Sequence, residues 1–484
     1  MTSISSITIG ETPEVIRPRA QEIGLVSSLT AMVGPGTRKG MLSLADQAVI
    51  SATSFLTTII VARASSREEL GVYYLILTLV FLARGIQMQV IFAPYMVYCH
   101  RRTGDASATY AGSVLVHQGG MLLLVMAGLL GVAGIIALGT ATATLSCVVW
   151  VLLGTLPFLL LREFNRNFSL AHLRLGEVMA VDAVVSVLQL GCLGLLWHFQ
   201  AISVPAVFGV LGGVCAASCL GWFLSQKHPW RFERAEIAAD WRSNWSFARW
   251  ALAGHVVGST APHVMPWILT AVHGEASVAL LGACGTLVGL PNVFVMGLNN
   301  LLSPKAARAF TEQGKAGLCR VLRKATVAFT LCAGGFCLLS LLAGDRLVTL
   351  VYGSRYGGGG PVLTVLALSV LAISMGIVAG SGLWAMDRPR TTFITDLCGL
   401  VVTLAVGAFC IPPLGAMGAA IAITTGIAVS AVMKWMVFVR LIRSIPESHV
   451  STDCVTVHGA NVILSAAKDL APNCGPRDPS LRSG

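Results

Sequence analysis

The feature that most constrains this chain is a series of twelve apolar stretches, each long enough to cross a lipid bilayer. A hydrocarbon core about 30 Å thick requires about 20 apolar residues per helix, and a chain in lipid must pair its backbone polar groups internally. With 55% hydrophobic and 11% charged residues, the composition agrees. We therefore expect an all-α polytopic membrane protein with about twelve transmembrane helices. The predicted spans are residues 43–62, 70–95, 111–138, 145–161, 177–196, 204–225, 245–272, 276–302, 325–343, 361–384, 393–411 and 415–439.

Basic residues gather in every second connection between these spans. If the N-terminus is cytoplasmic, 24 Lys and Arg residues, Arg162 and Arg166 among them, fall on the cytoplasmic side and 4 on the other. An excess of basic residues in cytoplasmic loops is the usual signal of membrane orientation. The pattern predicts that both termini are cytoplasmic, and it explains the net charge of +11 without a nucleic acid partner.

The longest break inside the membrane region separates two groups of six spans. We expect a cytoplasmic N-terminal tail (1–40), an N-terminal six-helix half (41–225), a cytoplasmic linker (226–244), a C-terminal six-helix half (245–439) and a cytoplasmic, disordered tail (440–484). The first 40 residues are polar, so we expect no cleavable signal. Because each half has an even number of helices, both halves enter the membrane from the same side. Transporters built from such repeats bind their substrate between the halves.

Neither a metal site nor a nucleotide site is expected. The 13 cysteines include no CxxC pair and lie mostly within the apolar spans, where cysteine packs as a small apolar residue. The glycine-rich run GPGTRKG at residues 34–40 lacks the GxxxxGK[ST] order of a phosphate-binding loop. We predict no disulfide, no metal and no cofactor.

Four blocks of sequence resemble one family of membrane proteins. They are residues 56–74 (LTTIIVARASSREELGVYY), 298–310 (LNNLLSPKAARAF), 351–363 (VYGSRYGGGGPVL) and 415–420 (GAMGAA). They are similar to blocks of the polysaccharide transporters, which include O-antigen flippases. That family is a branch of the superfamily that also holds the multidrug and toxic compound extrusion transporters and the lipid II flippase.

The resemblance implies a function that involves no enzymatic reaction. The protein would be a flippase that moves a polyprenyl-pyrophosphate-linked oligosaccharide across the inner membrane by alternating access of two halves. Its partners would be the lipid-linked glycan, membrane lipids and a coupling ion, H⁺ or Na⁺. Sugars and phosphates lose their water in lipid, so such a carrier must offer a polar lumen with buried cations.

Arg84, midway along the second span, is the first candidate for that lumen. A mid-membrane arginine costs roughly 2.5–3.5 kcal/mol on insertion scales, so it requires a partner or a function. Its planar guanidinium suits phosphate, and Gln87, three residues later, shares its helical face. The alternative is that Arg84 only joins helices by pairing with Asp46, Asp182 or a helix-end carbonyl.

Polar residues on one face of the first span also predict a hydrated interior. Gln47, Ser51, Ser54 and Thr58 recur at intervals of four, three and four residues, which places them on the same side of a helix. Hydrogen bonding between helices by small polar residues is the equally weighted alternative.

Two acids are candidate gate residues, because they lie at similar depths in matching helices of the two halves. Asp182 is in the fifth span and Asp396 in the eleventh. Either would pair with a cytoplasmic arginine or, as we favour, remain a solvated acid near a helix N-terminus.

The seventh and eighth spans complete the set of candidates. Pro262 and Pro266 remove backbone donors and predict a broken helix and a hinge, and they count as gate candidates. The remaining lumen candidates are His255, His263, Asn292 and Asn299. The histidines would bind phosphate or relay protons, and the asparagines would bind sugar hydroxyls. The alternative for all four is hydrogen bonding between helices.

A different function class within the same fold is an ion-coupled exporter of drugs or organic cations. It would place carboxylates such as Asp46 and Asp182 in the lumen, instead of Arg84 and amides. A membrane glycan polymerase or ligase would require a large outer loop, and the longest predicted outer connection is only about residues 344–360.

Overall fold

The computed structural model describes residues 35–140, 143–225 and 230–444, and these form helices and no strand. In chain order the elements are α2 (Pro35–Ala64), α3 (Arg67–Gln87), the π-helix η1 (Met88–Phe92), α4 (Ala93–Tyr98), the 3-10 helix η2 (Cys99–Arg101), α5 (Asp105–Ile135), the π-helix η3 (Ile136–Thr140), α6 (Ala143–Ala171), α7 (Leu175–His198), α8 (Val204–Ser225), α9 (Arg234–His273), α10 (Glu275–Tyr352), the 3-10 helix η4 (Ser354–Tyr356), α11 (Gly360–Ala385), α12 (Pro389–Leu414) and α13 (Ala416–Ser444). Of the predicted tails, only residues 35–40 and 440–444 lie within the described part, and both segments are helical.

Each of the twelve predicted spans falls within described residues, and all of their residues are helical except Gly415, a turn residue at the start of the last span. Ten helices in the described part of the chain are long and apolar enough to cross a membrane. One of them, α10, contains two predicted spans, 276–302 and 325–343, while α9, which contains span 245–272, is not among the ten. The chain is therefore a multi-pass membrane protein, as the apolar pattern predicts.

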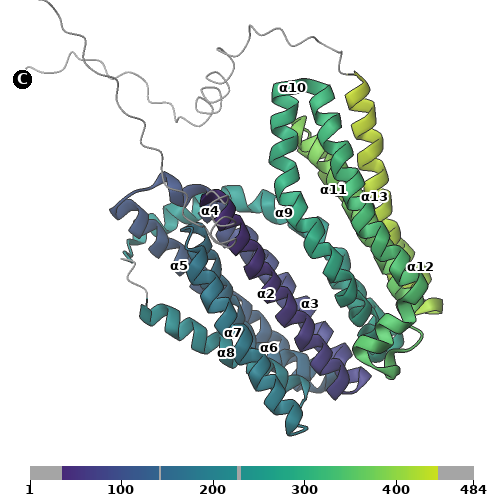
Figure 1. The fold of residues 1–484 in the computed structure, drawn as a ribbon. Helices are drawn as coiled ribbons and strands as arrows, with labels where there is room; N and C mark the ends of the chain where they lie inside the picture. The colour runs from purple at the N-terminus through teal and green to yellow at the C-terminus, as the bar shows by residue number, and fades with distance from the viewer. Residues whose placement is uncertain (1–34, 141–142, 226–229, 445–484) are drawn as a thin grey trace, which may run out of the picture.

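Helix α10 turns back on itself at Gly314. This residue has a φ of 59°, a left-handed conformation that glycine adopts without strain. Figure 1 shows the resulting pair of neighbouring green helices, joined at the upper end of the molecule. The start of α2 and the end of α13 lie at that same end, so the described ends of the chain are on one side.

Two helical bundles are visible in Figure 1, with α2 to α8 in one and α10 to α13 in the other. At the lower end, one apolar core joins the two bundles, since Tyr73 and Ile76 of α3 cluster there with Val278 and Tyr352 of α10. At the upper end the bundles have separate cores, one around Tyr95 and Phe168 and another around Leu322 and Phe438. The bundles are thus packed together only at the end opposite the Gly314 turn.

Helix α9 connects the bundles. Its first three turns belong to the predicted linker but are helical, and they dock on the N-terminal bundle. Asp240 pairs with Arg102 at 2.7 Å, and Asn244 accepts a hydrogen bond of 2.9 Å from Tyr110. Its C-terminal half packs on α12 of the other bundle.

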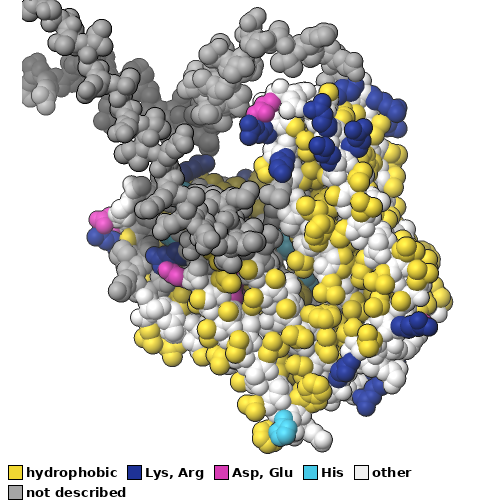
Figure 2. All heavy atoms as spheres, viewed as in Figure 1, with side chains coloured by type: hydrophobic (Ala, Val, Ile, Leu, Met, Phe, Trp, Pro, Cys, Tyr) yellow, Lys and Arg dark blue, Asp and Glu magenta, His cyan; other side chains and the backbone are white. Residues whose placement is uncertain are grey.

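The surface follows the same two-ended pattern. Yellow apolar side chains cover the flanks in Figure 2, and blue basic side chains gather at the upper end over α10 and α13. The exposed basic residues of α10 and α13 include Arg308, Arg320, Arg323, Lys324, Arg440 and Arg443. The end that carries them is the one predicted to face the cytoplasm.

Candidate functional site

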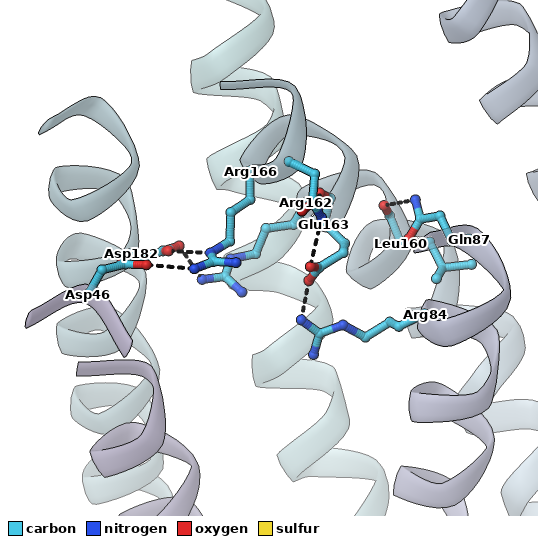
Figure 3. Close-up of polar contacts among 9 residues, drawn as sticks. Asp46, Arg84, Gln87, Leu160, Arg162, Glu163, Arg166 and Asp182 are labelled. Atoms are coloured by element: carbon cyan, nitrogen blue, oxygen red, sulfur yellow. Dashed lines mark hydrogen bonds and ion pairs between the residues drawn. The ribbon is translucent and has the colours of Figure 1, made fainter. Parts of the chain in front are cut away.

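The densest group of charged side chains in the described residues lies inside the N-terminal bundle. Figure 3 shows α6 in the middle of this group, with Arg84 of α3 on one side and Asp46 of α2 and Asp182 of α7 on the other. We call the six residues at its centre the charge cluster. They are Asp46, Arg84, Arg162, Glu163, Arg166 and Asp182.

Half of the charge cluster comes from a segment that we predicted to be a cytoplasmic loop. The predicted span ends at residue 161, but α6 continues to Ala171, so Arg162 and Arg166 lie within the helix and the predicted boundary is wrong. The helix continues because no glycine or proline follows Pro157 before its end. Leu160, Phe164 and Phe168 recur every four residues and are fully buried.

Arg166 bridges two carboxylates that are far apart in sequence. Its Nη2 lies 2.5 Å from Oδ2 of Asp46, and its Nε lies 2.8 Å from Oδ2 of Asp182. Arg162, one turn earlier, donates to the other oxygen of Asp182 at 2.5 Å. Only 2% of the Asp182 side chain is exposed, so the favoured prediction of a solvated acid is wrong and the alternative of pairing with arginines holds.

Arg84 pairs with Glu163, a partner that we did not predict. The guanidinium donates to Oε2 of Glu163, and the amide of Asn167 donates to Oε1 of the same carboxylate at 2.9 Å. The side chain of Arg84 is 34% exposed, against 17% for Arg162 and 12% for Arg166. Arg84 is therefore the guanidinium of the cluster that a ligand can reach most easily.

The charge cluster is balanced. Its three arginines carry +3 and its three carboxylates −3, a formal sum of zero. This differs from the expected excess of buried cations, because α6 supplies an acid beside its two bases. A buried ion of either sign is costly unless it is paired and hydrogen-bonded, so the network allows six charges to lie inside the helical bundle.

Gln87 lies next to this cluster and is fully buried. Its amide donates to the side-chain oxygen of Gln118 at 2.9 Å and to the carbonyl of Leu160 at 2.8 Å. Both contacts hold helices together, so in this conformation Gln87 joins α3 to α5 and α6.

The predicted polar face of α2 is divided between solvent-accessible and buried positions. Gln47 and Ser54 are exposed and Ser51 is half-buried, and none of their side chains bonds to another described residue. Thr58 is buried and donates to the carbonyl of Ser54 at 3.0 Å. The neighbouring Thr57, which we did not single out, accepts a hydrogen bond of 2.8 Å from Gln189 and joins α2 to α7.

The seventh predicted span is an unbroken helix in α9, although Pro262 and Pro266 lie inside it. The predicted break is absent from this described segment, and side chains bond to two backbone carbonyls along the same stretch. Ser259 donates to the carbonyl of His255 at 2.7 Å, and Nδ1 of His263 lies 2.5 Å from the carbonyl of Ser259. Hydrogen-bonding side chains commonly keep proline-containing membrane helices intact in this way.

His255 is the candidate of α9 that comes nearest to the charge cluster. Its Nε2 lies against Gly85 of α3, so closely that a Cβ added to this glycine would be 2.1 Å away. Gly85 directly follows Arg84. The structure therefore brings His255 beside α3, at the level where Arg84 leaves the helix.

Asn292, Asn299 and Asp396 belong to the C-terminal bundle and do not join the charge cluster. Both asparagines are half-buried on α10, and Oδ1 of Asn292 has no hydrogen-bond partner in the described part of the chain. Asp396 accepts hydrogen bonds of 2.7 Å from Lys434 and from Ser430 of α13. Asp182 and Asp396 each lie seven residues after the first residue of their helix, so they occupy matching positions along α7 and α12.

The end of the molecule opposite the basic surface is closed by polar contacts between the bundles. Tyr74 of α3 hydrogen-bonds Thr286 of α10 at 2.8 Å, and Trp267 of α9 donates to Thr78 at 2.9 Å. Arg63 donates from Nε to the carbonyl of Val351 at 2.9 Å, which satisfies a free carbonyl at the end of α10. These contacts seal the side that the charge pattern predicts to be outside.

No protein-family model matches the sequence. The chain is similar to a capsular polysaccharide biosynthesis protein, CapF, of Staphylococcus aureus, with 21% identity over 222 residues. The match spans 46% of this chain and 56% of CapF, little more than half the length of that relative.

Solved structures cover much more of the chain. An inward-facing multidrug resistance MATE family transporter of the MOP superfamily aligns with a TM-score of 0.67 and 13% identity, over 84% of this chain and 94% of that one. The lipid II flippase MurJ in an inward closed conformation gives a TM-score of 0.65 and 13% identity over 84% and 88%. An outward-facing MATE family transporter gives 0.57 and 12% identity over 84% and 95%.

These similarities confirm the fold that the four sequence blocks imply. These solved structures are transporters and a flippase. The inward-facing MATE structure aligns with a higher TM-score than the outward-facing one. The chain has the fold of the MOP superfamily transporters.

Proposed function

We propose that this protein is a flippase that moves a polyprenyl-pyrophosphate-linked oligosaccharide from the cytoplasmic to the outer leaflet of the inner membrane. The fold shared with MATE transporters and MurJ supports transport by alternating access of two helical bundles. The similarity to a capsular polysaccharide biosynthesis protein supports a glycan as cargo.

One observation carries the proposal beyond the fold. Arg84 is paired with Glu163 but leaves a third of its side chain exposed, 34%, inside the N-terminal bundle. A pyrophosphate carries more negative charge than a carboxylate and accepts two parallel N–H bonds from one guanidinium. The cargo would therefore compete with Glu163 for Arg84, and releasing the arginine from α6 would couple cargo binding to movement of α3.

The bundle contacts suggest how such binding would be transmitted. Arg84 is followed by Gly85, against which His255 of α9 packs. Helix α9 docks on the N-terminal bundle at Asp240 and packs on α12 at its other end. A shift of α3 toward the cargo would thus move α9 and change the angle between the bundles.

An ion-coupled exporter of drugs or organic cations is the second candidate. The observation that favours it is Asp46, which is 5% exposed and whose Oδ1 has no hydrogen-bond partner among the described residues. An unpaired carboxylate oxygen is a natural site for a proton or a small cation. Its other oxygen, however, is already bound by Arg166, which lowers the negative charge available to a cationic drug.

The test is a transport assay in vesicles that contain a polyprenyl pyrophosphate glycan. We expect Arg84→Ala to reduce flipping by about tenfold or more, and Arg84→Lys to retain part of it because lysine keeps the charge but loses the two-pronged geometry. Glu163→Gln separates the two roles of Arg84. If the arginine serves the cargo, this variant still binds the polyprenyl pyrophosphate glycan and Arg84→Ala does not, whereas an arginine that only joins helices would leave cargo binding the same in both variants.

Two outcomes would contradict the proposal. Unchanged flipping in both Arg84 variants would remove Arg84 from the mechanism. Efflux of organic cations without any flipping of glycan would establish the exporter instead, and Asp46→Asn should then abolish that efflux.

A further inference from the structure

A cavity whose lining is mainly apolar, with several charged side chains, lies at the side of the N-terminal bundle, away from the contact between the bundles. It has a volume of about 1050 Å³ and is lined by α6, α7 and α8, with no described residue of α9 to α13 in its wall. We call it the lateral crevice. This volume lies just above the roughly 300–1,000 Å³ typical of sites for small ligands.

The lateral crevice has a polar floor and an apolar rim. Arg162, Arg166 and Asn165 of α6 form the floor, while Val184 and Leu188 of α7 line the rim and are 58% and 48% exposed. In a bilayer, these exposed apolar side chains face acyl chains. The crevice therefore opens toward lipid, although its floor carries charges.

Acyl chains alone would fill such a crevice poorly. An arginine at membrane depth costs roughly 2.5–3.5 kcal/mol even on the lower scales, and less when a polar group lies beside it. The floor also has unused hydrogen-bonding capacity, because Nε of Arg162 has no partner in the described residues. The amide of Asn165, 6% exposed, has none apart from the thiol of Cys219.

The charge that faces the crevice favours an anion. Its lining carries three arginines, at positions 162, 166 and 174, against the two carboxylates Glu177 and Asp182, a formal sum of +1, while Asp46, the third carboxylate and the partner of Arg166, lies outside the lining. Arg174 lies at the mouth, where α6 ends and α7 begins, and is 37% exposed. Arg162 lies nine residues before Ala171, the last residue of α6. At 1.5 Å per residue, the floor is therefore about 13 Å along the helix from the mouth.

We propose that the lateral crevice binds the headgroup of an anionic membrane phospholipid, such as phosphatidylglycerol. The phosphate lies between Arg174 and the floor, and the acyl chains leave over Val184 and Leu188. The mouth lies at the end of the bundle that carries the predicted cytoplasmic connections, where anionic lipids attract basic residues. The crevice shares Arg162, Arg166 and Asp182 with the charge cluster, but Arg84, the residue proposed to bind the glycan pyrophosphate, does not line it, and no lining residue comes from the other bundle.

Native mass spectrometry of the purified full-length protein tests this site, with phosphatidylglycerol and phosphatidylcholine added separately. We expect wild type to retain one phosphatidylglycerol about tenfold more tightly than phosphatidylcholine. Arg174→Gln should weaken this binding about fivefold, since one basic residue near the surface contributes about 1 kcal/mol. Ser218→Trp should abolish it by filling the crevice.

Leu220→Trp is the matched control, because Leu220 is on the same helix, is 62% exposed and does not line the crevice. It should bind phosphatidylglycerol as wild type does. Equal retention of the two phospholipids by wild type would overturn the proposal, and so would unchanged binding in both Arg174→Gln and Ser218→Trp. Displacement of phosphatidylglycerol by an equal amount of polyprenyl phosphate would reassign the crevice to the lipid of the cargo.

Discussion

Replacing Arg166 by methionine tests how far the charge cluster holds the N-terminal bundle together. The two contacts of Arg166, at 2.5 Å to Asp46 and 2.8 Å to Asp182, are its links to α2 and α7. The variant leaves Asp182 with Arg162 but leaves Asp46, whose side chain is 6% exposed, without a cation. Removing one partner of a buried ion pair costs about 3–5 kcal/mol, because the other charge stays buried and unpaired.

We therefore expect Arg166→Met to lower the free energy of unfolding by about 3 kcal/mol or more. Asp46→Asn in the same chain should restore part of this loss, since neighbours in one network commonly couple by about 0.5–3 kcal/mol. Both are measured by reversible unfolding in mixed micelles of a mild detergent and dodecyl sulfate.

Arg174→Met provides the matched control. Arg174 pairs with Glu177 at 3.7 Å, and the two side chains are 37% and 60% exposed. Such surface pairs contribute about 0–1 kcal/mol, so this variant should unfold almost as wild type does. A loss below about 0.5 kcal/mol for Arg166→Met, the range of ordinary surface substitutions, would refute the conclusion that the cluster is shielded from water.

Two further predictions concern the contacts between the bundles. Gly85→Ala places a Cβ in steric conflict with the imidazole of His255, so this ring must move away from α3, and vesicle transport should fall. Gly128→Ala, with nothing within 4 Å of the added Cβ, should leave transport unchanged, and equal activity of the two variants would disprove the contact. Arg63→Gln removes the 2.9 Å bond to the carbonyl of Val351 and should lengthen the distance between spin labels at the lower ends of α3 and α10. Arg346→Gln, an exposed arginine of α10 near the same end, is the control, and equal distances in both variants would show that Arg63 does not close this side.

The helices, the membrane spans and the general architecture could be predicted from the sequence. Every segment that crosses the bilayer in an all-α protein must be helical and about 20 residues long. The closeness of α12 and α13 has the same local origin. Gly399 and Gly426 leave room for direct backbone approach, with 2.7 Å between the carbonyl oxygen of Gly426 and a Cβ built on Gly399. Small residues at helix contacts are typical of membrane bundles.

The partners of the charged residues were decided by the tertiary structure. Arg84 can be identified from the sequence because it is a charged residue within an apolar span. Its partner Glu163 was not predicted, because it lies in a segment that the sequence pattern assigned to a cytoplasmic loop. The spacing of Arg162, Glu163, Arg166 and Asn167 was the available signal, because it places bases and acid on adjacent helical faces. It shows only that charges share a helix, and not which other helices they meet.

The sequence by itself determined that this chain crosses the membrane many times, which end carries the basic residues and which polar residues lie at membrane depth. These properties depend on local hydrophobicity and charge, each read within one span. The tertiary structure alone decided that the arginines of α6 bind Asp46 and Asp182, that Glu163 holds Arg84, and that the bundles close at one end. Those contacts join helices distant in sequence, and the free energy of a buried charge depends on neighbours that only folding brings to it.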